Sequence, residues 1–412
     1  MDKPEPLTYF KRRPLRICIL SYSIYDMDLR VKRYAKSLND SGYFVDVLAL
    51  KRNGLAKKET IDHIHIQRIM DRKYNEKGLF SYALNMIRFF LKATFLITFK
   101  HLRYRYSLIH VNNPPDFLIF STVLPKLFGA KIIMDMHENI PELFSAKFDN
   151  RNGKLILKLL LLLERMATRY ADFVLAAHDL LKNRLIKRDQ LSEDRCLSLL
   201  NYPQLDNFEP IPHKSDDPEL KILYPGTISY HHGIDILVNA IALVKEKGFP
   251  VRLEIYATST NQKYLDEIHH LITKLDLRRE IIFNDPVPAN KIGTIMAQAD
   301  MGIVPKRGGE FGSEAFSTKI LEFMAAGIPV IASRTAIEEY YFNEALLQFF
   351  EPENPINLAE SIMLLINNQD RRKALVLNGL KFVSENNWER KKIKYLNTIE
   401  TLLISQKKRK ER

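Results

Sequence analysis

The chain has 412 residues, of which 46% are hydrophobic and 27% are charged. This composition is typical of a folded globular protein and excludes collagen-like, coiled-coil and wholly disordered chains. The length is too great for one ordinary core and predicts two domains. The two cysteines, Cys18 and Cys196, are too few for a disulfide framework or a multi-thiolate metal site, and they fit a reducing compartment.

Segments that direct a chain into a membrane are not expected. Residues 1–14 are polar and lack the apolar core of a signal peptide. No window holds about 20 apolar residues without charge, so we expect no segment that spans a bilayer. At this point the sequence predicts a cytoplasmic, two-domain protein, most consistent with an enzyme.

The net charge of +13 is unevenly distributed along the chain. Residues 1–105 hold 22 Lys and Arg against 10 Asp and Glu, and residues 407–412 hold five against one. Such asymmetry predicts an anionic partner for the N-terminal part, which is a membrane surface, a nucleic acid or a phosphorylated substrate. A general solubilising excess of charge is the alternative.

In chain order, short apolar runs alternate with longer helical patterns, which is typical of parallel sheets built from βαβ units. The first half predicts strands at 15–21, 44–50, 64–69, 107–111, 130–134 and 172–176, with helices at 28–41 and 80–103 among the segments between them. The second half predicts strands at 222–224, 252–256, 281–283, 302–304 and 329–332, a turn at Gly226 and a helix at 233–247.

Residues 201–219 hold four prolines without periodicity, and the domain linker is expected there. The expected architecture is α/β, with two doubly wound Rossmann-like halves that face one another across a cleft. In such folds ligands bind beyond the carboxyl ends of the strands. The predicted division is a first domain over 1–205, a linker over 206–219, a second domain over 220–385, and a terminal helix with a basic tail over 386–412.

The segment 310–333, EFGSEAFSTKILEFMAAGIPVIAS, carries the most specific pattern. Ser317 and Thr318 can cap a helix that stops at Gly327, and the N–H groups of a helix start can bind phosphate. Lys319 lies in the first turn, with Glu322 on the same face, where its carboxylate can accept both hydroxyls of a ribose. Glu314, in the preceding loop, would face the group that the phosphate carries. A solvated helix face is the alternative for such a Glu pair.

These residues resemble the nucleotide-sugar motif of the GT-B glycosyltransferases of family 4, in which two glutamates are separated by seven residues. The resemblance covers roughly residues 15–385. Further segments agree with it: Asp28-Leu-Arg30-Val31, Ile109-His110-Val111-Asn112, Asp135-Met-His137-Glu138 with Pro141-Glu142, Asn201-Tyr-Pro203 and Tyr224-Pro-Gly226.

The resemblance implies a retaining, metal-independent glycosyltransferase that uses no cofactor besides its UDP- or GDP-linked sugar donor. The acceptor is expected to be a glycan or a lipid-linked molecule, in surface polysaccharide or glycolipid synthesis. His137 and Glu314 are the implied catalytic residues beside the reacting sugar. Glu322 is the implied ribose ligand, and Gly226 would let the backbone approach the diphosphate.

The chain departs from the family at the diphosphate. The family usually has Arg directly after the Gly226 position and Lys before the Gly233 position, whereas this chain has Thr227 and His232. We expect Lys306, Arg307 or Lys319 to replace those cations. The predicted donor-binding set is Gly226, His232, Lys306, Arg307, Ser317, Thr318, Lys319 and Glu322. Adjacent His231 and His232 seldom share one metal, so no metal site is predicted.

The helix at 80–103 has a wide apolar arc and a narrow stripe that holds Asn85, Arg88, Lys92 and Arg103. Such an arrangement suits a helix lying in a membrane interface, and residues 80–105 are the predicted contact with an anionic membrane surface. A helix buried against the sheet is the alternative. The leucine-rich stretch 155–166 is expected to pack in the core or to form a second interface.

The sequence therefore predicts a cytoplasmic glycosyltransferase, peripherally associated with the inner face of the plasma membrane. Two alternatives stay open: a GT-B nucleotide-sugar epimerase or hydrolase, and a non-catalytic GT-B scaffold. Nucleic-acid binding is disfavoured, because the basic first quarter shows no RNP-like, helix-turn-helix or aromatic–basic pattern.

Overall fold

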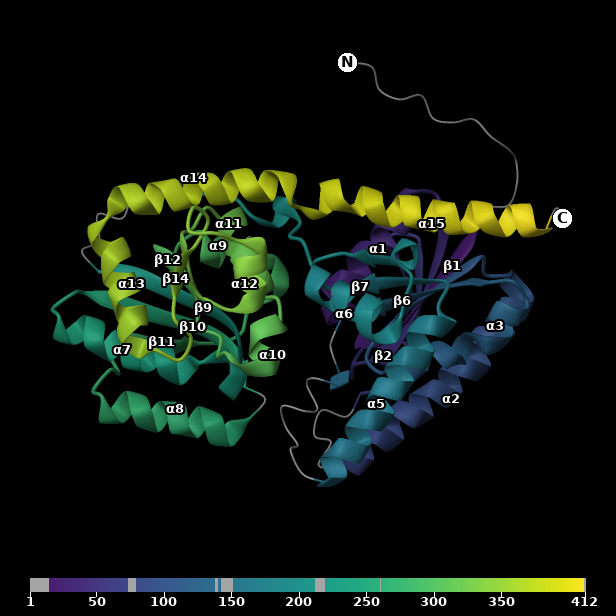
Figure 1. Cartoon of the computed structure of the whole chain (residues 1–412), viewed down its shortest axis with the longest axis horizontal. Helices are drawn as coiled ribbons and strands as arrows, with labels where there is room; N and C mark the ends of the chain where they lie inside the picture. Colours follow the sequence, from purple (N-terminus) through teal and green to yellow (C-terminus); the bar gives the residue numbers. More distant parts are fainter. Residues whose placement is uncertain are drawn as a thin grey trace, which may run out of the picture. The chain divides into compact units, whose positions relative to one another are not determined.

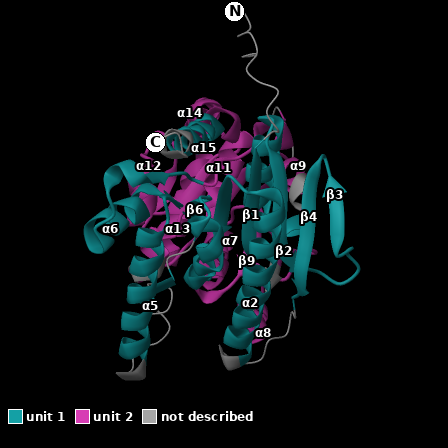
Figure 2. Cartoon of the chain, turned by 90° about the vertical axis from the view of Figure 1, so that its right-hand side faces the viewer, with its two compact units in different colours: residues 1–200, 392–412 teal, residues 201–391 magenta. Residues whose placement is uncertain are grey.

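The computed structural model describes residues 15–72, 79–137, 140–141, 151–211, 219–259 and 261–410. The chain forms two compact units, coloured separately in Figure 2. Unit 1 comprises residues 1–200 and 392–412, and unit 2 comprises residues 201–391. The predicted linker, 206–219, falls within unit 2, and its residues 212–218 lie outside the described residues.

Unit 1 is built on an eight-stranded sheet in the order β3-β4-β2-β1-β5-β6-β7-β8. Every neighbouring pair is parallel except the antiparallel pair of β3 and β4 at one edge. The strands are β1 (Arg16–Ile24), β2 (Phe44–Lys51), β3 (Lys58–Ile61), β4 (Ile64–Asp71), β5 (Leu108–Asn112), β6 (Lys131–Met136), β7 (Phe173–Ala176) and β8 (Cys196–Ser198).

A capping carboxylate and a glycine mark the two ends of the first α-helix of unit 1. The Asp28 carboxylate caps α1 by accepting the N–H of Val31 at 3.1 Å, and Gly42 follows the helix with a φ of +85°. The described helices are α1 (Leu29–Asp40), α2 (Leu79–Tyr104), α3 (Val123–Leu127), α5 (Arg151–Tyr170) and α6 (Asp179–Asp189), with the short 3₁₀ helices η1 (Tyr25–Met27), η2 (Asp116–Thr122) and η3 (Glu193–Arg195). The last helix of the chain, α15 (Trp388–Lys410), returns to unit 1 from Lys392 onward (Figure 1).

Unit 2 contains a six-stranded, wholly parallel sheet in the order β11-β10-β9-β12-β13-β14. The strands are β9 (Leu220–Ile228), β10 (Val251–Ser259), β11 (Ile281–Asn284), β12 (Met301–Val304), β13 (Val330–Ser333) and β14 (Gln348–Phe350). The helices are α7 (Ile234–Glu246), α8 (Gln262–Lys274), α9 (Ala289–Met296), α10 (Gly309–Glu314), α11 (Thr318–Ala325), α12 (Ala336–Tyr341), α13 (Pro355–Asn367) and α14 (Gln369–Glu385), with 3₁₀ helices η4 (Leu205–Asn207) and η5 (Tyr230–His232).

The two parallel α/β sheets confirm the predicted fold class, and every predicted strand is present. Three details of the prediction were wrong. Gly226 lies within β9 rather than in a turn, because β9 stays paired with β10 through Ile228. The short strands β3, β8 and β14 were not predicted. Glu314 ends α10 instead of lying in a loop.

The expectation that no segment could cross a bilayer was also wrong on length and composition. Residues Ser81–Tyr104 of α2 are long and apolar enough to do so. One face of this helix is nevertheless part of the unit 1 core, where Phe89, Ala93 and Ile97 are fully buried. Asn85 lies on that buried side, not with the exposed basic residues as the sequence suggested.

Candidate functional site

A small cavity of about 140 Å³ lies at the carboxyl ends of β9 and β12 in unit 2. The carboxyl edge of a parallel sheet is where doubly wound folds bind ligands. Five of the predicted donor-binding residues line this cavity: His232, Lys306, Ser317, Thr318 and Lys319. Tyr224, Val304, Pro305, Ala315 and Phe316 complete it.

Lys319 lies directly over the backbone of Gly226. Gly226 has a φ of +135°, and a Cβ atom there would stand 2.4 Å from Cε and 2.9 Å from Nζ of Lys319. Only glycine combines this backbone conformation with room for the lysine. The backbone of Gly226 thus approaches a cation closely, and its approach to the diphosphate of a ligand stays a prediction.

The ammonium group of Lys319 has no hydrogen-bond or ion-pair partner among the described residues. Its Nζ lies 5.6 Å from the ring centroid of Tyr224, and the side chain is half-buried. Burial lowers the pKa of Lys319, while the charge of Glu322 opposes that shift and the charge of Lys306 adds to it. A cation in this position has binding capacity left for an anion.

Lys306, in contrast, is held within the protein. Its Nζ lies 2.8 Å from Glu338 Oε1 and donates to the carbonyls of Gly312 and Ala315. Burial lowers the pKa of Lys306 and raises the pKa of Glu338, and the charge of each group opposes the shift of the other. Lys306 therefore lines the cavity with a charge that is already paired.

Arg307 does not line the cavity. Its guanidinium donates to the carbonyl of Tyr230 at 3.0 Å, to Asp235, and to Glu353 at 3.5 Å, and it stacks on the Tyr230 ring. These contacts hold the first turn of α7 and η5 together. Of the three candidate cations, Lys319 is the one that the described residues leave without a carboxylate partner.

His232 occupies the cavity as a neutral group. Burial lowers its pKa to about 4, and the nearby charge of Lys319 contributes to the shift. The Nδ1 atom lies 3.0 Å from Ser229 Oγ, which fixes the orientation of the ring. At neutral pH this side chain can form hydrogen bonds but cannot supply the charge of the family's lysine.

The start of α11 faces the same cavity. Ser317 occupies the N-cap position, but its hydroxyl does not bond to the helix backbone, so the predicted side-chain cap is wrong. The N–H groups of the first turn consequently have no capping acceptor among the described side chains. Glu322, one turn further, is half-buried and acts on Lys319 through its charge; neither Glu322 nor Glu314 lines the cavity.

Unit 1 carries the other predicted catalytic residue, His137, directly after β6. Its Nε2 lies 2.9 Å from Asp135 Oδ2 and 3.1 Å from Asn112 Oδ1, and its backbone N–H donates to Asn113 Oδ1 at 2.5 Å. Both neighbours of Nε2 are acceptors, so Nε2 carries the hydrogen and Nδ1 is the nitrogen left for a ligand. The imidazole is 20% exposed.

Asp135 is fully buried beneath this histidine. Arg30 of α1 binds it with Nε at 3.0 Å from Oδ2 and with Nη2 at Oδ1. Burial would raise the pKa of Asp135, but the charges of Arg30 and His137 outweigh it and hold the pKa well below its usual value. The carboxylate therefore stays ionised and fixes the ring of His137.

His110 and Tyr395 extend the same network, and sequence reasoning missed their roles. His110 Nδ1 lies 2.9 Å from the Tyr395 hydroxyl, and its Nε2 lies 3.6 Å from Asp135 Oδ2. Burial lowers the pKa of His110. The spacing Asp135-Met-His137 was a visible signal for one pair, but nothing in the sequence brings Arg30 or Tyr395 to Asp135.

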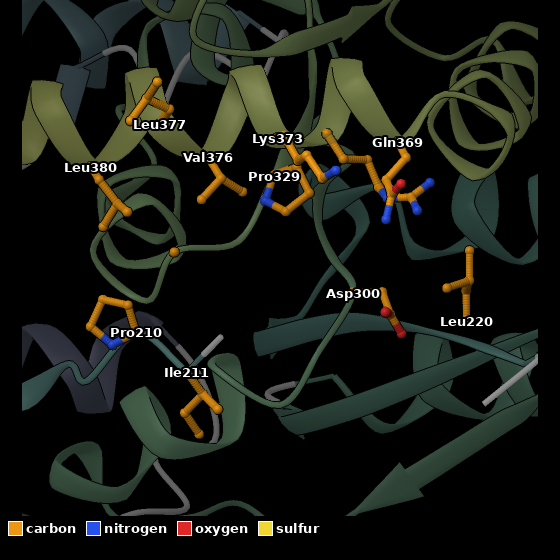
Figure 3. Close-up of a pocket in the computed structure, with 12 residues that line it drawn as sticks. Pro210, Ile211, Leu220, Asp300, Pro329, Gln369, Lys373, Val376, Leu377 and Leu380 are labelled. Carbon is orange, nitrogen blue, oxygen red and sulfur yellow. The ribbon is translucent and has the colours of Figure 1, made fainter. Parts of the chain in front are cut away.

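A larger cavity, of about 470 Å³, lies elsewhere in unit 2 (Figure 3). Val376, Leu377 and Leu380 of α14 line one side of it, and Pro210 and Ile211 line another. Leu220, Asp300 and Pro329 stand at the amino ends of β9, β12 and β13. None of the predicted site residues lines it, and it lies at the edge of the sheet opposite to the smaller cavity.

Two family models match the chain. The model described as Glycosyltransferase Family 4 matches residues 29–197, and the model described as Glycosyl transferases group 1 matches residues 206–382. An uncharacterized glycosyltransferase of Methanocaldococcus jannaschii is 27% identical over 228 residues, which is 55% of this chain and 58% of that protein. A capsular polysaccharide biosynthesis glycosyltransferase of Staphylococcus aureus is 24% identical over 56% of this chain and 63% of its own. The chain thus matches somewhat less than two thirds of each relative's length.

Solved structures share the fold. Sucrose-phosphate synthase from Thermosynechococcus elongatus has a TM-score of 0.76 at 18% identity, covering 95% of this chain and 100% of that one. HepE from Anabaena, solved with UDP and glucose, has a TM-score of 0.70 at 16% identity, covering 94% and 100%. With one short gap the two family matches run from residue 29 to residue 382. The chain belongs to the GT-B glycosyltransferases of family 4.

Proposed function

We propose that the protein transfers a sugar, with retention and without a metal ion, from a UDP- or GDP-linked donor to a glycan or lipid-linked acceptor. We place this reaction in surface polysaccharide or glycolipid synthesis, at the cytoplasmic face of the plasma membrane. Membership of the family supports the reaction type. The UDP and glucose of the Anabaena structure and the capsular role named for the Staphylococcus relative support the donor and the pathway.

One observation carries the proposal: Lys319, which has no ion pair among the residues that the structure describes, lies over Gly226 in the cavity that the start of α11 lines. Negative charge grows on the leaving diphosphate during sugar transfer, so the site must aim cations and N–H donors at it. Lys319 and the first turn of α11 supply both, and neutral His232 adds a hydrogen bond. In this proposal Lys319 replaces the family's Arg and Lys, while Lys306 and Arg307 keep the walls of the site in place.

The remaining roles follow the family pattern. Glu322 binds the ribose hydroxyls and Glu314 binds hydroxyls of the donor sugar. His137 acts beside the reacting sugar through Nδ1, with its ring held by Asp135 and Asn112. A fixed ring loses little freedom when the sugar binds, which favours the transition state.

Calorimetric titration of UDP, GDP and ADP into the full chain tests the proposal. We expect one nucleotide to bind wild type with chelator present, and to bind Lys319→Met and Glu322→Ala at least tenfold more weakly. The matched control is Lys263→Met, which removes an exposed lysine of α8 and leaves binding unchanged. Absence of binding to any nucleotide by the folded protein would favour the non-catalytic scaffold. Turnover of a nucleotide-sugar without any acceptor would favour the epimerase or hydrolase.

A further inference from the structure

The helix α2 presents one apolar face to the core and another to solvent. Phe89, Ala93 and Ile97 are fully buried, whereas the opposite face exposes a stripe of large side chains. Phe95, at the centre of this stripe, is 76% exposed. The stripe consists of Ile87, Leu91, Phe95, Phe99 and Leu102. Residues three or four apart share a helix face, so these five form one continuous apolar strip.

The helix α5 repeats the arrangement. Glu164, Ala167 and Thr168 are fully buried against unit 1, while Leu155 is 72% exposed. The exposed strip comprises Leu155, Ile156, Leu159, Leu162 and Met166. Isolated exposed leucines are ordinary on protein surfaces, but two continuous strips of this length are not.

Both exposed faces are cationic and free of carboxylates. The sequence of α2 contains no Asp or Glu, and Arg88, Lys92 and Arg103 are exposed on it. The one carboxylate of α5, Glu164, is fully buried and paired with Arg188, whereas Lys154 and Lys158 are exposed. The exposed faces therefore combine large apolar side chains with positive charge alone.

The two helices flank one structural element. The 3₁₀ helix η2 packs against α2 through an edge contact of Phe117 with Phe90, and against α5 through one of Phe120 with Tyr170. Figures 1 and 2 both show α2 and α5 extending beyond the sheet toward the same end of unit 1. The two helices consequently belong to one layer of the unit.

We propose that the exposed faces of α2 and α5 together form a docking surface for an anionic lipid bilayer. Apolar side chains enter the interface between headgroups and acyl chains, and the flanking lysines and arginines bind the anionic headgroups. A second copy of the chain is a poorer partner, because it would bring the same positive charges to the contact. The proposal deepens the proposed function, since a lipid-linked acceptor lies at such a surface, and it extends the predicted contact from α2 to α5.

Co-sedimentation of the full chain with vesicles tests this proposal. One set of vesicles is phosphatidylcholine, and the other contains about one third phosphatidylglycerol. We expect wild type to bind the anionic vesicles, to release at high salt, and to bind the neutral vesicles far more weakly. Phe95→Glu on α2 and Leu155→Glu on α5 should each weaken binding by about tenfold or more, because each places a carboxylate where an apolar side chain enters the lipid.

Leu377→Glu on α14 of unit 2 is the matched control. Leu377 is 70% exposed, nearly as much as Leu155, and its variant should bind vesicles as wild type does. The proposal is overturned if wild type ignores anionic vesicles, if Leu155→Glu binds them like wild type, or if the two variants abolish self-association instead. Nucleotide titration of wild type separates the two proposals, because a wild-type protein that binds nucleotide but not anionic vesicles overturns the docking surface alone.

Discussion

Replacing Lys319 by methionine tests whether the charge of this side chain serves ligand binding or the stability of the fold. Methionine preserves most of the side-chain volume over Gly226 and removes the charge. Lys319 Nζ has no ion pair among the described residues, and burial lowers its pKa. The partial dehydration of this charge therefore destabilises the folded wild-type protein. The variant should be as stable as wild type, or more stable by up to about 1 kcal/mol.

Nucleotide affinity should change in the opposite direction. A hydrogen bond between a charged donor and a phosphate contributes about 1.5–3 kcal/mol. This range corresponds to a dissociation constant about 10 to 150 times larger for Lys319→Met. The effect should shrink at high salt, because the interaction is between charges near the surface of the cavity.

Lys306→Met provides the contrast within the same cavity. It leaves Glu338 buried without its cation, and removal of one partner from a buried pair costs about 3–5 kcal/mol. Thermal unfolding without ligand measures the stability of both variants. Calorimetry with the nucleotide that wild type binds most tightly measures their nucleotide affinity. The reasoning is refuted if Lys319→Met unfolds like Lys306→Met, or if its nucleotide affinity stays within about twofold of wild type.

Three further changes test other parts of the two units. Gly226→Ala should lower stability by about 1–3 kcal/mol and weaken nucleotide binding, because its Cβ displaces Lys319 at a strained φ; unfolding and titration measure both. Asp135→Asn should destabilise unit 1 by about 3–5 kcal/mol in chemical denaturation, because Arg30 stays buried without a carboxylate, and an unchanged midpoint would contradict the assignment. Burial lowers the folded pKa of His232 to about 4, below its ordinary value, so stability is full above pH 6.5 and falls as the pH drops toward 4, by about 3 kcal/mol. Replacing His232 by Gln should flatten that part of the pH–stability curve.

The fold could be predicted where burial leaves a clear pattern. The central strands β1, β5 and β6 are buried on both faces, so they read as continuous apolar runs. The edge strand β3 has the sequence KETI and is wholly exposed, so only its pairing with β4 makes it a strand. The Pro-Gly pair at Gly226 reads as a turn, but pairing with β10 keeps it extended.

The candidate site was predicted as a set of residues, not as a set of contacts. The cavity gathers four of them because the end of β12 and the start of α11 are close in sequence, whereas the fifth, His232, comes from η5. The partners that bind Lys306 and Arg307 come from α12 and α7, and no local pattern indicates that they meet. Hydrophobic periodicity specifies which face of an element is buried, but distant ion pairs depend on the register and packing of whole elements.

The return of α15 to unit 1 has a consequence for synthesis on the ribosome. Residues 1–200 emerge first, but they lack α15. This helix places Tyr395 against Tyr34 and His110, and its side chains Ile399 and Leu403 are buried. Unit 2 is continuous in sequence and is complete before the last residues of unit 1 leave the ribosome. The first unit to begin is therefore the last to be finished, and a chain that ends prematurely near residue 391 exposes apolar surface that cellular quality control can recognise.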